Sequence, residues 1–293
     1  MKGPTFNRGD AYLLMTTAIW GLNFPVAKAV LGVLDPYAFA GMRWIVATVA
    51  LAAIVLIRTR DLLVPWRDFL VMAALGSLGV AVFQTIWTNG LAHTTAAKGS
   101  ILVSTTPIFA ALGGALIGRA PGLRAWAGAA LGFGGVFLLV NNSLSEITVG
   151  GGSLKGDLMM LAVAALWAVY SAGAAPVIAR HGALKTTFWI IIVGSICLVL
   201  IALPEMAATD WGALGFRTWS ELLYTAIFSA ALGFVWWYEG IRHLGPVRAM
   251  LYSYLIPVFG VAASAALLGD VMSGVQLLGA ALALAGVALA RRN

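Results

Sequence analysis

The sequence predicts an all-α polytopic membrane protein with ten transmembrane helices, arranged as two inverted repeats of five helices. Three observations lead to this fold class. Charged residues are scarce, ten separate apolar runs are each about long enough to cross a bilayer, and strings of residues recur about 150 positions apart.

The composition is that of a chain whose surface faces hydrocarbon. Of its 293 residues, 61% are hydrophobic and 10% are charged, whereas a soluble domain has about 25% charged residues. The single cysteine, Cys197, lies in an apolar run, which excludes an internal disulfide and zinc held by several thiolates. We expect no metal, no cofactor and no nucleic-acid partner. The partners that we expect are membrane lipid and a small-molecule substrate.

Each expected span is an apolar run between charged or Pro/Gly-rich breaks. About 20 apolar residues cross the hydrocarbon core as a helix. The first run follows a short polar segment and is long enough to span, so we expect a retained helix rather than a cleaved signal peptide. The ten expected spans are residues 11–34, 37–57, 69–91, 99–118, 125–140, 158–179, 186–203, 222–241, 249–268 and 274–290.

The distribution of positive charge predicts the orientation. Lysine and arginine concentrate in cytoplasmic connections. With the N-terminus in the cytoplasm, thirteen of the eighteen lie in cytoplasmic segments and three in outer ones, and Lys28 and Arg43 lie within spans. We therefore expect a multi-pass protein of the cell inner membrane with both termini cytoplasmic.

The two halves of the sequence resemble each other. Gly9-Asp10 precedes Trp20 with the same spacing as Gly156-Asp157 precedes Trp167. The pairs that match at an offset of 150 are Trp87 and Trp237, Gly90 and Gly240, His93 and His243, Lys98 and Arg248, Pro107 and Pro257, and Phe109 and Phe259. Because five helices per half is an odd number, the second half starts on the opposite side of the membrane. Inverted repeats with a binding site between the halves are a recurring transporter design.

Several strings also resemble a known family. They are Trp-Gly-Leu-Asn-Phe-Pro-Val-Ala-Lys (20–28), Arg43-Trp44, Gly-Leu-Ala-His-Thr-Thr-Ala-Ala (90–97) and Thr-Pro-Ile-Phe-Ala-Ala-Leu (106–112). Together they resemble the EamA family of the drug/metabolite transporter (DMT) superfamily, including its exporters of aromatic amino acids. The resemblance implies a ten-helix export carrier, with residues 1–141 as the first EamA-like five-helix repeat, 142–156 as a linker and 157–293 as the second repeat. The second half departs from the pattern, because Ala168-Val169-Tyr170 follows Trp167 and no lysine corresponds to Lys28.

Sequence patterns of enzymes are missing. The three histidines lie at expected helix ends, none belongs to a His-Glu-x-x-His site, and the sequence contains no Gly-x-Ser-x-Gly string. We therefore expect no catalytic residues. Proton-coupled pumps use acidic or histidine side chains in mid-membrane, and no such carboxylate pair is present. This favours facilitated movement or exchange, with a proton-driven drug/metabolite efflux carrier as the alternative.

Polar and aromatic residues within the expected spans are the candidate substrate contacts. Asn23 is costly in hydrocarbon, so it faces either a substrate cavity or the backbone carbonyls that Pro25 frees. Arg43 binds either a carboxylate substrate or loop carbonyls. Lys28 either contacts substrate or extends to the outer interface. Mid-span tryptophan and tyrosine need a hydrogen-bond partner, which a cavity supplies. Simple packing between helices is the alternative explanation for each of them. The expected substrate-binding residues are Trp20, Asn23, Arg43, Trp44, Gln84, Trp87, Ser104, Trp167, Tyr170, Trp237 and Tyr252.

The sequence therefore predicts a transporter that exports small metabolites by alternating access around a central aromatic-lined cavity. Amino acids with aromatic or apolar side chains suit such a wall best, because ring pairs contribute about 0.5–1.5 kcal/mol beyond area burial. Patterns of small residues permit close helix approach, and they leave monomer and homodimer as alternatives.

Overall fold

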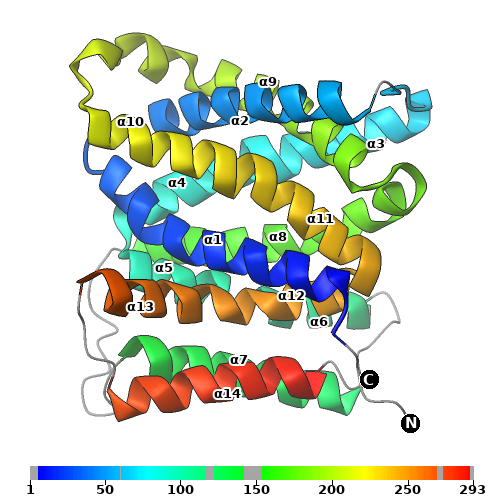
Figure 1. Ribbon diagram of the computed structural model, residues 1–293, viewed down its shortest axis with the longest axis vertical. Helices are drawn as coiled ribbons and strands as arrows, with labels where there is room; N and C mark the ends of the chain where they lie inside the picture. Colours follow the sequence, from blue (N-terminus) through cyan, green and yellow to red (C-terminus); the bar gives the residue numbers. More distant parts are fainter. Residues whose placement is uncertain (1–5, 60, 117–121, 142–153, 269–272, 291–293) are drawn as a thin grey trace.

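The computed structural model describes residues 6–59, 61–116, 122–141, 154–268 and 273–290, and within these ranges every regular element is helical. Figure 1 shows the helices stacked as roughly parallel rods. The elements before residue 142 are α1 (Arg8–Val30), α2 (Pro36–Arg58), α3 (Trp66–Gly76), η1 (Ser77–Val82), α4 (Phe83–His93), α5 (Ala96–Val103), α6 (Thr106–Leu116) and α7 (Leu123–Asn141). The elements after residue 153 are α8 (Leu154–His181), α9 (Ala183–Ala208), η2 (Trp211–Ala213), α10 (Phe216–Leu223), η3 (Tyr224–Leu232), α11 (Gly233–Leu244), α12 (Pro246–Leu251), η4 (Tyr252–Tyr254), α13 (Leu255–Leu268) and α14 (Gly274–Ala290).

Seven helices of the described chain are long and apolar enough to cross a membrane. This is fewer than the ten spans expected, for two physical reasons. The fifth and tenth expected spans form the shorter apolar helices α7 and α14, and the ninth is divided into α12, the 3-10 turn η4 and α13. The seven are Arg8–Val30, Pro36–Arg58, Trp66–His93, Gly99–Leu116, Leu154–His181, Ala183–Ala208 and Phe216–Leu244.

The boundary of the expected linker differs in the structure. Residues 142–153 lie outside the described part of the chain. Leu154 to Gly156 are helical and begin α8, because the polar Gly/Ser-rich stretch ends there and an apolar run follows. The second half of the described chain therefore begins three residues earlier than expected.

Two of the long helices contain a π-helical stretch. The stretch η1 joins α3 to α4, and η3 joins α10 to α11. A shift of 150 positions places η1 within η3, so both halves carry the irregularity at the same place. A π-helical stretch leaves backbone carbonyls without their usual helical partners and is frequent at functional sites.

The first helix of each half packs on a helix of the other half through glycine. A Cβ on Gly9 of α1 would lie 2.6 Å from the Cβ of His243 in α11. A Cβ on Gly156 of α8 would lie 2.9 Å from the Cβ of His93 in α4. Real Cβ atoms do not approach so closely, so both positions require glycine. The same contact thus occurs twice, and the two halves interlock.

The helices α7 and α14 form a tight pair of their own, at the bottom of Figure 1. A Cβ on Gly135 would lie 2.7 Å from the carbonyl oxygen of Gly279, and one on Gly286 would lie 2.6 Å from that of Gly128. Small residues allow backbones to meet at this distance in a membrane. None of the described residues that line the central pocket belongs to this pair, which packs on η4 through a hydrogen bond from the Tyr254 hydroxyl to the carbonyl oxygen of Ala129 at 2.9 Å.

Candidate functional site

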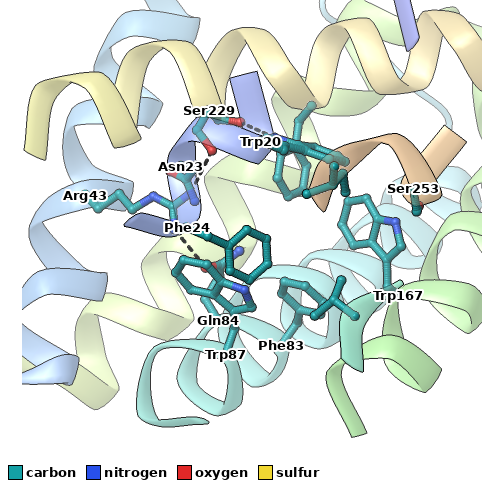
Figure 2. Close-up of a pocket in the computed structure, with 13 residues that line it drawn as sticks. Trp20, Asn23, Phe24, Arg43, Phe83, Gln84, Trp87, Trp167, Ser229 and Ser253 are labelled. Carbon is teal, nitrogen blue, oxygen red and sulfur yellow. Dashed lines mark hydrogen bonds between the residues drawn. The ribbon is translucent and has the colours of Figure 1, made fainter. Parts of the chain in front are cut away.

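A pocket lies at the centre of the bundle and is bordered by both halves of the chain. Figure 2 shows its side chains converging from several helices. Six of the eleven residues expected from the sequence line it: Trp20, Asn23, Arg43, Gln84, Trp87 and Trp167. The other lining residues are Phe24, Phe83, Val103, Ser229, Phe234, Ser253 and Ile256.

The space inside the pocket is small. The empty volume among its side chains is ≈ 500 Å³, part of it open to solvent, but the centres of water-sized molecules can occupy only ≈ 60 Å³. A water molecule needs about 10–15 Å³ measured in this way, so the pocket admits a few waters. A molecule with an aromatic ring requires the surrounding rings to move apart. The structure therefore shows a contracted pocket.

Arg43 is the charged residue of the pocket. It lies on α2 and is 3% exposed. Its Nε donates to the carbonyl oxygen of Thr225 at 3.1 Å, its Nη1 to Gln84 Oε1 at 3.2 Å and its Nη2 to Ser229 Oγ at 3.3 Å. All three acceptors are neutral, and among the described residues no carboxylate forms an ion pair with Arg43. The guanidinium is thus held in place without being neutralised.

Aromatic rings surround the Arg43 guanidinium. Its Cζ lies 5.2 Å from the centroid of the Trp87 ring and 5.9 Å from those of Phe39 and Trp44. The face of an aromatic ring attracts a cation by roughly 0.5–2 kcal/mol. The rings therefore stabilise the charge in part and also keep water from it.

Asn23 provides an unused acceptor beside the arginine. It lies on α1, is 4% exposed and lines the pocket. Its Oδ1 is buried and accepts no hydrogen bond within the described part of the chain. A buried acceptor without a donor costs about 1–3 kcal/mol, and an N–H group of a ligand would remove that cost. The backbone carbonyls near Pro25 are the alternative partners of Asn23 expected from the sequence. Those carbonyls could bind only the side-chain NH2 group, so Oδ1 is available to a ligand in either case.

The remaining wall of the pocket consists of packed rings. Trp20 of α1 and Trp167 of α8 meet edge to face at 5.3 Å between centroids, and they occupy the same position in the two halves. Phe234 of α11 lies 6.0 Å from Trp20 and 5.4 Å from Trp167. Phe83 lies 5.3 Å from Trp167. The pocket thus has a polar side at Asn23 and Arg43 and an apolar side made of rings.

The π-helical stretch η3 holds both sides of the pocket. Its Thr225 carbonyl accepts from Arg43, and its Ser229 carbonyl accepts from Trp20 Nε1 at 2.9 Å. Its Ser229 hydroxyl is the third partner of Arg43. A regular helix would use these carbonyls internally, so the irregular winding lets the backbone position two pocket side chains.

Three of the expected residues lie behind the wall rather than in it. Trp44 is fully buried, and its ring packs edge to face on Phe234 at 5.3 Å. Its Nε1 has no hydrogen-bond partner within the described part of the chain. Trp237 is also fully buried, contacts Trp20 at 5.2 Å and donates to Ser171 Oγ at 3.2 Å. Tyr170 forms a hydroxyl–hydroxyl hydrogen bond with Tyr238.

The other two expected residues outside the lining join helices. The hydroxyl of Ser104 donates to the carbonyl of Ser100 at 2.7 Å and lies 3.5 Å from the carbonyl oxygen of Ser253. The hydroxyl of Tyr252 donates to Asp10 Oδ1, which connects η4 to the start of α1. These contacts stabilise the helix packing next to the pocket.

Lys28 caps a helix end. Its Nζ donates to the carbonyl oxygens of Leu91, Ala92 and Thr94 at 2.8, 3.0 and 2.7 Å. These carbonyls lie at the C-terminal end of α4, where a helix leaves its acceptors unpaired and favours positive charge. Lys28 thus fastens α1 to the end of α4 and lies outside the pocket lining.

Sequence reasoning missed several lining residues, and the internal repeat held a signal for one of them. Phe234 is at offset 150 from Gln84, and Ser253 is at offset 150 from Val103. Extending each candidate to its repeat partner would have added Phe234. Ser229 carries no such signal, because its role depends on the π-helical winding of η3. No group of three or more His, Cys, Asp or Glu side chains that could hold a metal ion occurs within the described ranges.

Comparison with known proteins identifies the class of the chain. The sequence model of the EamA-like transporter family matches residues 7–141 and again residues 154–292. An uncharacterized transporter of Archaeoglobus fulgidus is 30% identical over 248 residues, which are 84% of each chain. A probable terminal-alkyne amino-acid exporter of Streptantibioticus cattleyicolor is 28% identical over 96% of this chain and 92% of its own. A probable amino-acid metabolite efflux pump of Salmonella typhimurium is 27% identical over 96% of this chain and 94% of its own.

Among solved structures, one crystal structure illustrates the shared fold. It superposes with a TM-score of 0.74 over 96% of both chains at 19% identity. At that identity the likeness concerns the fold alone. Together with the seven long apolar helices, the family matches indicate a multi-pass membrane transporter rather than an enzyme.

Proposed function

The chain belongs to the EamA-like transporter family, and from this premise we propose that it exports amino acids, with a preference for aromatic and apolar side chains. The observation that carries the proposal is the division of the central pocket. Arg43 and Asn23 form a polar side, and rings of both halves form an apolar side. An aromatic amino acid has the same division, with a charged backbone at one end and a ring at the other.

Each group of the substrate has a counterpart in the pocket. The carboxylate binds Arg43, because a guanidinium binds carboxylates through paired N–H donors. The ammonium group donates to Asn23 Oδ1, which lacks a partner. The side chain inserts between Trp20, Trp167 and Phe234, where stacking adds about 0.5–1.5 kcal/mol. Two relatives named for amino-acid export support the assignment.

The proposed mechanism is alternating access in the inner membrane. The family matches each half of the chain once, which supports two repeats of five helices with ten spans in all. Inverted repeats give two similar packings that open the pocket to opposite sides. The excess of arginine and lysine at one side favours cytoplasmic termini. A single chain contains the whole pocket, so transport is possible both for a monomer and within a homodimer.

The alternative is a proton-driven drug or metabolite efflux carrier. Such a carrier needs a titratable group at the substrate site. Arg43 is the ionisable residue among the described lining residues, and arginine keeps its proton at all physiological pH values. The pocket composition therefore favours facilitated movement or exchange over proton coupling.

Counterflow in proteoliposomes tests the proposal. Vesicles loaded with unlabelled phenylalanine should take up labelled phenylalanine and tryptophan faster than labelled alanine or threonine. Protein-free vesicles are the control. No counterflow with any of the twenty amino acids would overturn the proposal, and strong accumulation driven by a pH gradient would favour the proton-driven alternative.

Thiol labelling tests the orientation. In a variant with Cys197→Ala, a cysteine at Thr209 should react with an impermeant reagent from outside intact cells. A cysteine at Thr59 should react only after the membrane is opened. Labelling of both positions from the same side would contradict the expected topology, because five spans, an odd number, are expected between Thr59 and Thr209.

A further inference from the structure

Within the described part of the chain, the contracted pocket holds a positive charge that has no negatively charged partner. Arg43 is 3% exposed, and its hydrogen-bond acceptors are the neutral groups of Thr225, Gln84 and Ser229. A charge within a membrane costs several kcal/mol unless it is paired or hydrated. The guanidinium does not lose its proton under physiological conditions. Something other than deprotonation must therefore compensate the charge when no substrate is bound.

The geometry leaves donors and space for an anion. A guanidinium carries five N–H groups, and the three hydrogen bonds of Arg43 use three of them. The cavity of ≈ 60 Å³ next to it holds a few water-sized particles, but no amino acid until the rings move apart. A monatomic anion, or a small planar one such as nitrate, is of the size that fits. The rings of Trp87, Trp44 and Phe39 around the guanidinium favour an anion that gives up water readily.

We infer that, when no amino acid is bound, Arg43 holds a small, weakly hydrated inorganic anion such as chloride or nitrate. This anion competes with the substrate carboxylate. The inference rests on the proposed function only for the competition, since anion binding follows from the site itself. The anion uses Arg43 and leaves Asn23 Oδ1 unsatisfied, whereas an amino acid satisfies both. The anion therefore binds more weakly than a preferred amino acid and is displaced by it.

Thermal unfolding of the purified wild-type protein without amino acid tests anion binding directly. Solutions of chloride, bromide, nitrate and sulfate are compared at equal ionic strength and pH. Because a ligand that binds the folded state stabilises it by mass action, the unfolding temperature should rise with the concentration of chloride, bromide or nitrate. Sulfate should have a smaller effect, because it is larger and more strongly hydrated. Equal effects of all four salts would indicate charge screening and overturn the inference.

Variants then locate the anion. Arg43→Gln should abolish the difference between chloride and sulfate, and Arg43→Lys should retain part of it. Arg58→Gln, at the exposed end of the same helix, should leave the difference intact. A difference that persists in Arg43→Gln would place the anion elsewhere. If Arg43→Gln does not fold, quenching decides instead. Bromide bound at Arg43 would quench the fluorescence of Trp87, because the centroid of the Trp87 ring lies 5.2 Å from Arg43 Cζ. Trp87→Phe should therefore remove a saturable part of the fluorescence quenching.

Competition is measured by transport. With sulfate as the reference salt, chloride should raise the apparent KM for phenylalanine by about two- to tenfold and leave the maximal rate unchanged, as for any two ligands of one site. A fall in maximal rate with constant KM would contradict competition. The two proposals fail separately. Loss of amino-acid counterflow with intact halide stabilisation refutes the proposed function, and counterflow that is indifferent to chloride refutes this inference.

Discussion

At corresponding positions of the two halves, the pocket receives different side chains. In the first half, three residues after Trp20 comes Asn23, and in the second half, three residues after Trp167 comes Tyr170. Gln84 of the first half corresponds to Phe234 of the second. Asn23 and Gln84 face the pocket with polar groups, whereas Phe234 contributes a ring and Tyr170 lies behind the wall.

The packing of the two halves, by contrast, is nearly the same. Gly9 meets His243 as Gly156 meets His93. Both long helices with a π-helical stretch carry it at the same place. The contrast shows which features the repeat preserves. In the proposed mechanism, alternating access needs two equivalent packings, which agrees with matching residues where the halves interlock. The proposed amino-acid substrate has two unlike ends, which agrees with an unsymmetrical lining.

The clearest asymmetry is Arg43, which gives the largest expected effect. The helix α9, which follows the first helix of the second half, carries Lys185 and Glu205 near its ends and no charge between them. Replacing Arg43 with Gln should reduce kcat/KM for phenylalanine by about 100-fold or more, since charged hydrogen bonds contribute roughly 1.5–3 kcal/mol each. Export rates at equal membrane abundance would measure this.

The matched control is Arg58→Gln on the same helix, for which we expect unchanged transport. Arg43→Lys should recover part of the activity, because it keeps the charge but loses the paired donors. Transport by Arg43→Gln at the wild-type rate would show that the arginine only anchors η3 to α2, and the polar side of the pocket would then lose its assigned role.

The second prediction concerns the helix packing that the two halves share. It compares Gly90 and Gly240, which occupy corresponding positions of the two halves. A Cβ on Gly240 would overlap the branched side chain of Leu13, whereas one on Gly90 would lie 3.0 Å from the flexible Met160 Sδ. Gly240→Ala should therefore lower the free energy of unfolding by about 1–3 kcal/mol, the usual cost of overpacking. Gly90→Ala should cost less than about 1 kcal/mol.

Thermal unfolding of both variants checks this prediction. A larger loss in Gly90→Ala than in Gly240→Ala would mean that the two interlocking contacts differ in a way that the side chains do not explain. Equal losses of unfolding free energy in the two variants would indicate that the Leu13 side chain moves aside as easily as that of Met160.

Sequence reasoning recovered the shared features more fully than the differing ones. Apolar runs and the repeated strings around Gly90 and Gly240 depend on local composition, so helices and their pairing can be read from the chain. Which side chain enters the pocket depends on helix rotation. Trp237 and Trp87 match in sequence, yet Trp87 lines the pocket and Trp237 lies behind it. The winding of η3, which brings the buried Ser229 to the pocket lining, has no signal in its residues.

The third prediction compares the two tryptophans of equal position. Trp20 donates to the Ser229 carbonyl at 2.9 Å in addition to stacking on Trp167. Trp20→Phe keeps a ring but removes the donor of that hydrogen bond. The lost hydrogen bond costs about 1–1.5 kcal/mol. We expect about a tenfold lower kcat/KM for tryptophan, and a change of less than about threefold for Trp167→Phe.

Alanine variants separate stacking from general damage. Trp20→Ala, Trp87→Ala and Trp167→Ala should slow export of tryptophan and phenylalanine more than export of alanine, while Trp66→Ala, on a side chain that is 68% exposed, should slow neither. If the three pocket variants transport phenylalanine and tryptophan normally, the rings serve packing alone and the preference for aromatic substrates is wrong.

The smallest expected effect belongs to a charge pair that joins the halves at the surface. Lys185 Nζ of α9 lies 2.9 Å from Asp61 Oδ2, in the connection between α2 and α3, and 3.2 Å from the carbonyl oxygen of Leu63. The hydrogen bond from Lys185 lowers the pKa of Asp61, aided by the backbone N–H of Leu63 and the positive charge of Lys185. A lowered carboxyl pKa gives a contribution that is present above the usual aspartate pKa of about 3.9. That contribution is lost as the pH falls through the lowered pKa.

We therefore expect Asp61→Asn to lower the unfolding temperature slightly and by the same amount at pH 8 and pH 5, with the difference from wild type shrinking below about pH 4. The difference should also shrink in high salt, because Asp61 is exposed and exposed pairs are screened. Phenylalanine counterflow at pH 7 should not change. The contrast with Arg43 is physical: at the surface, water and salt compensate an unpaired charge, whereas in the pocket we propose that a bound anion does so. A large loss of transport in Asp61→Asn would mean that the surface connection between the halves moves during the cycle, and that asymmetry extends beyond the pocket lining.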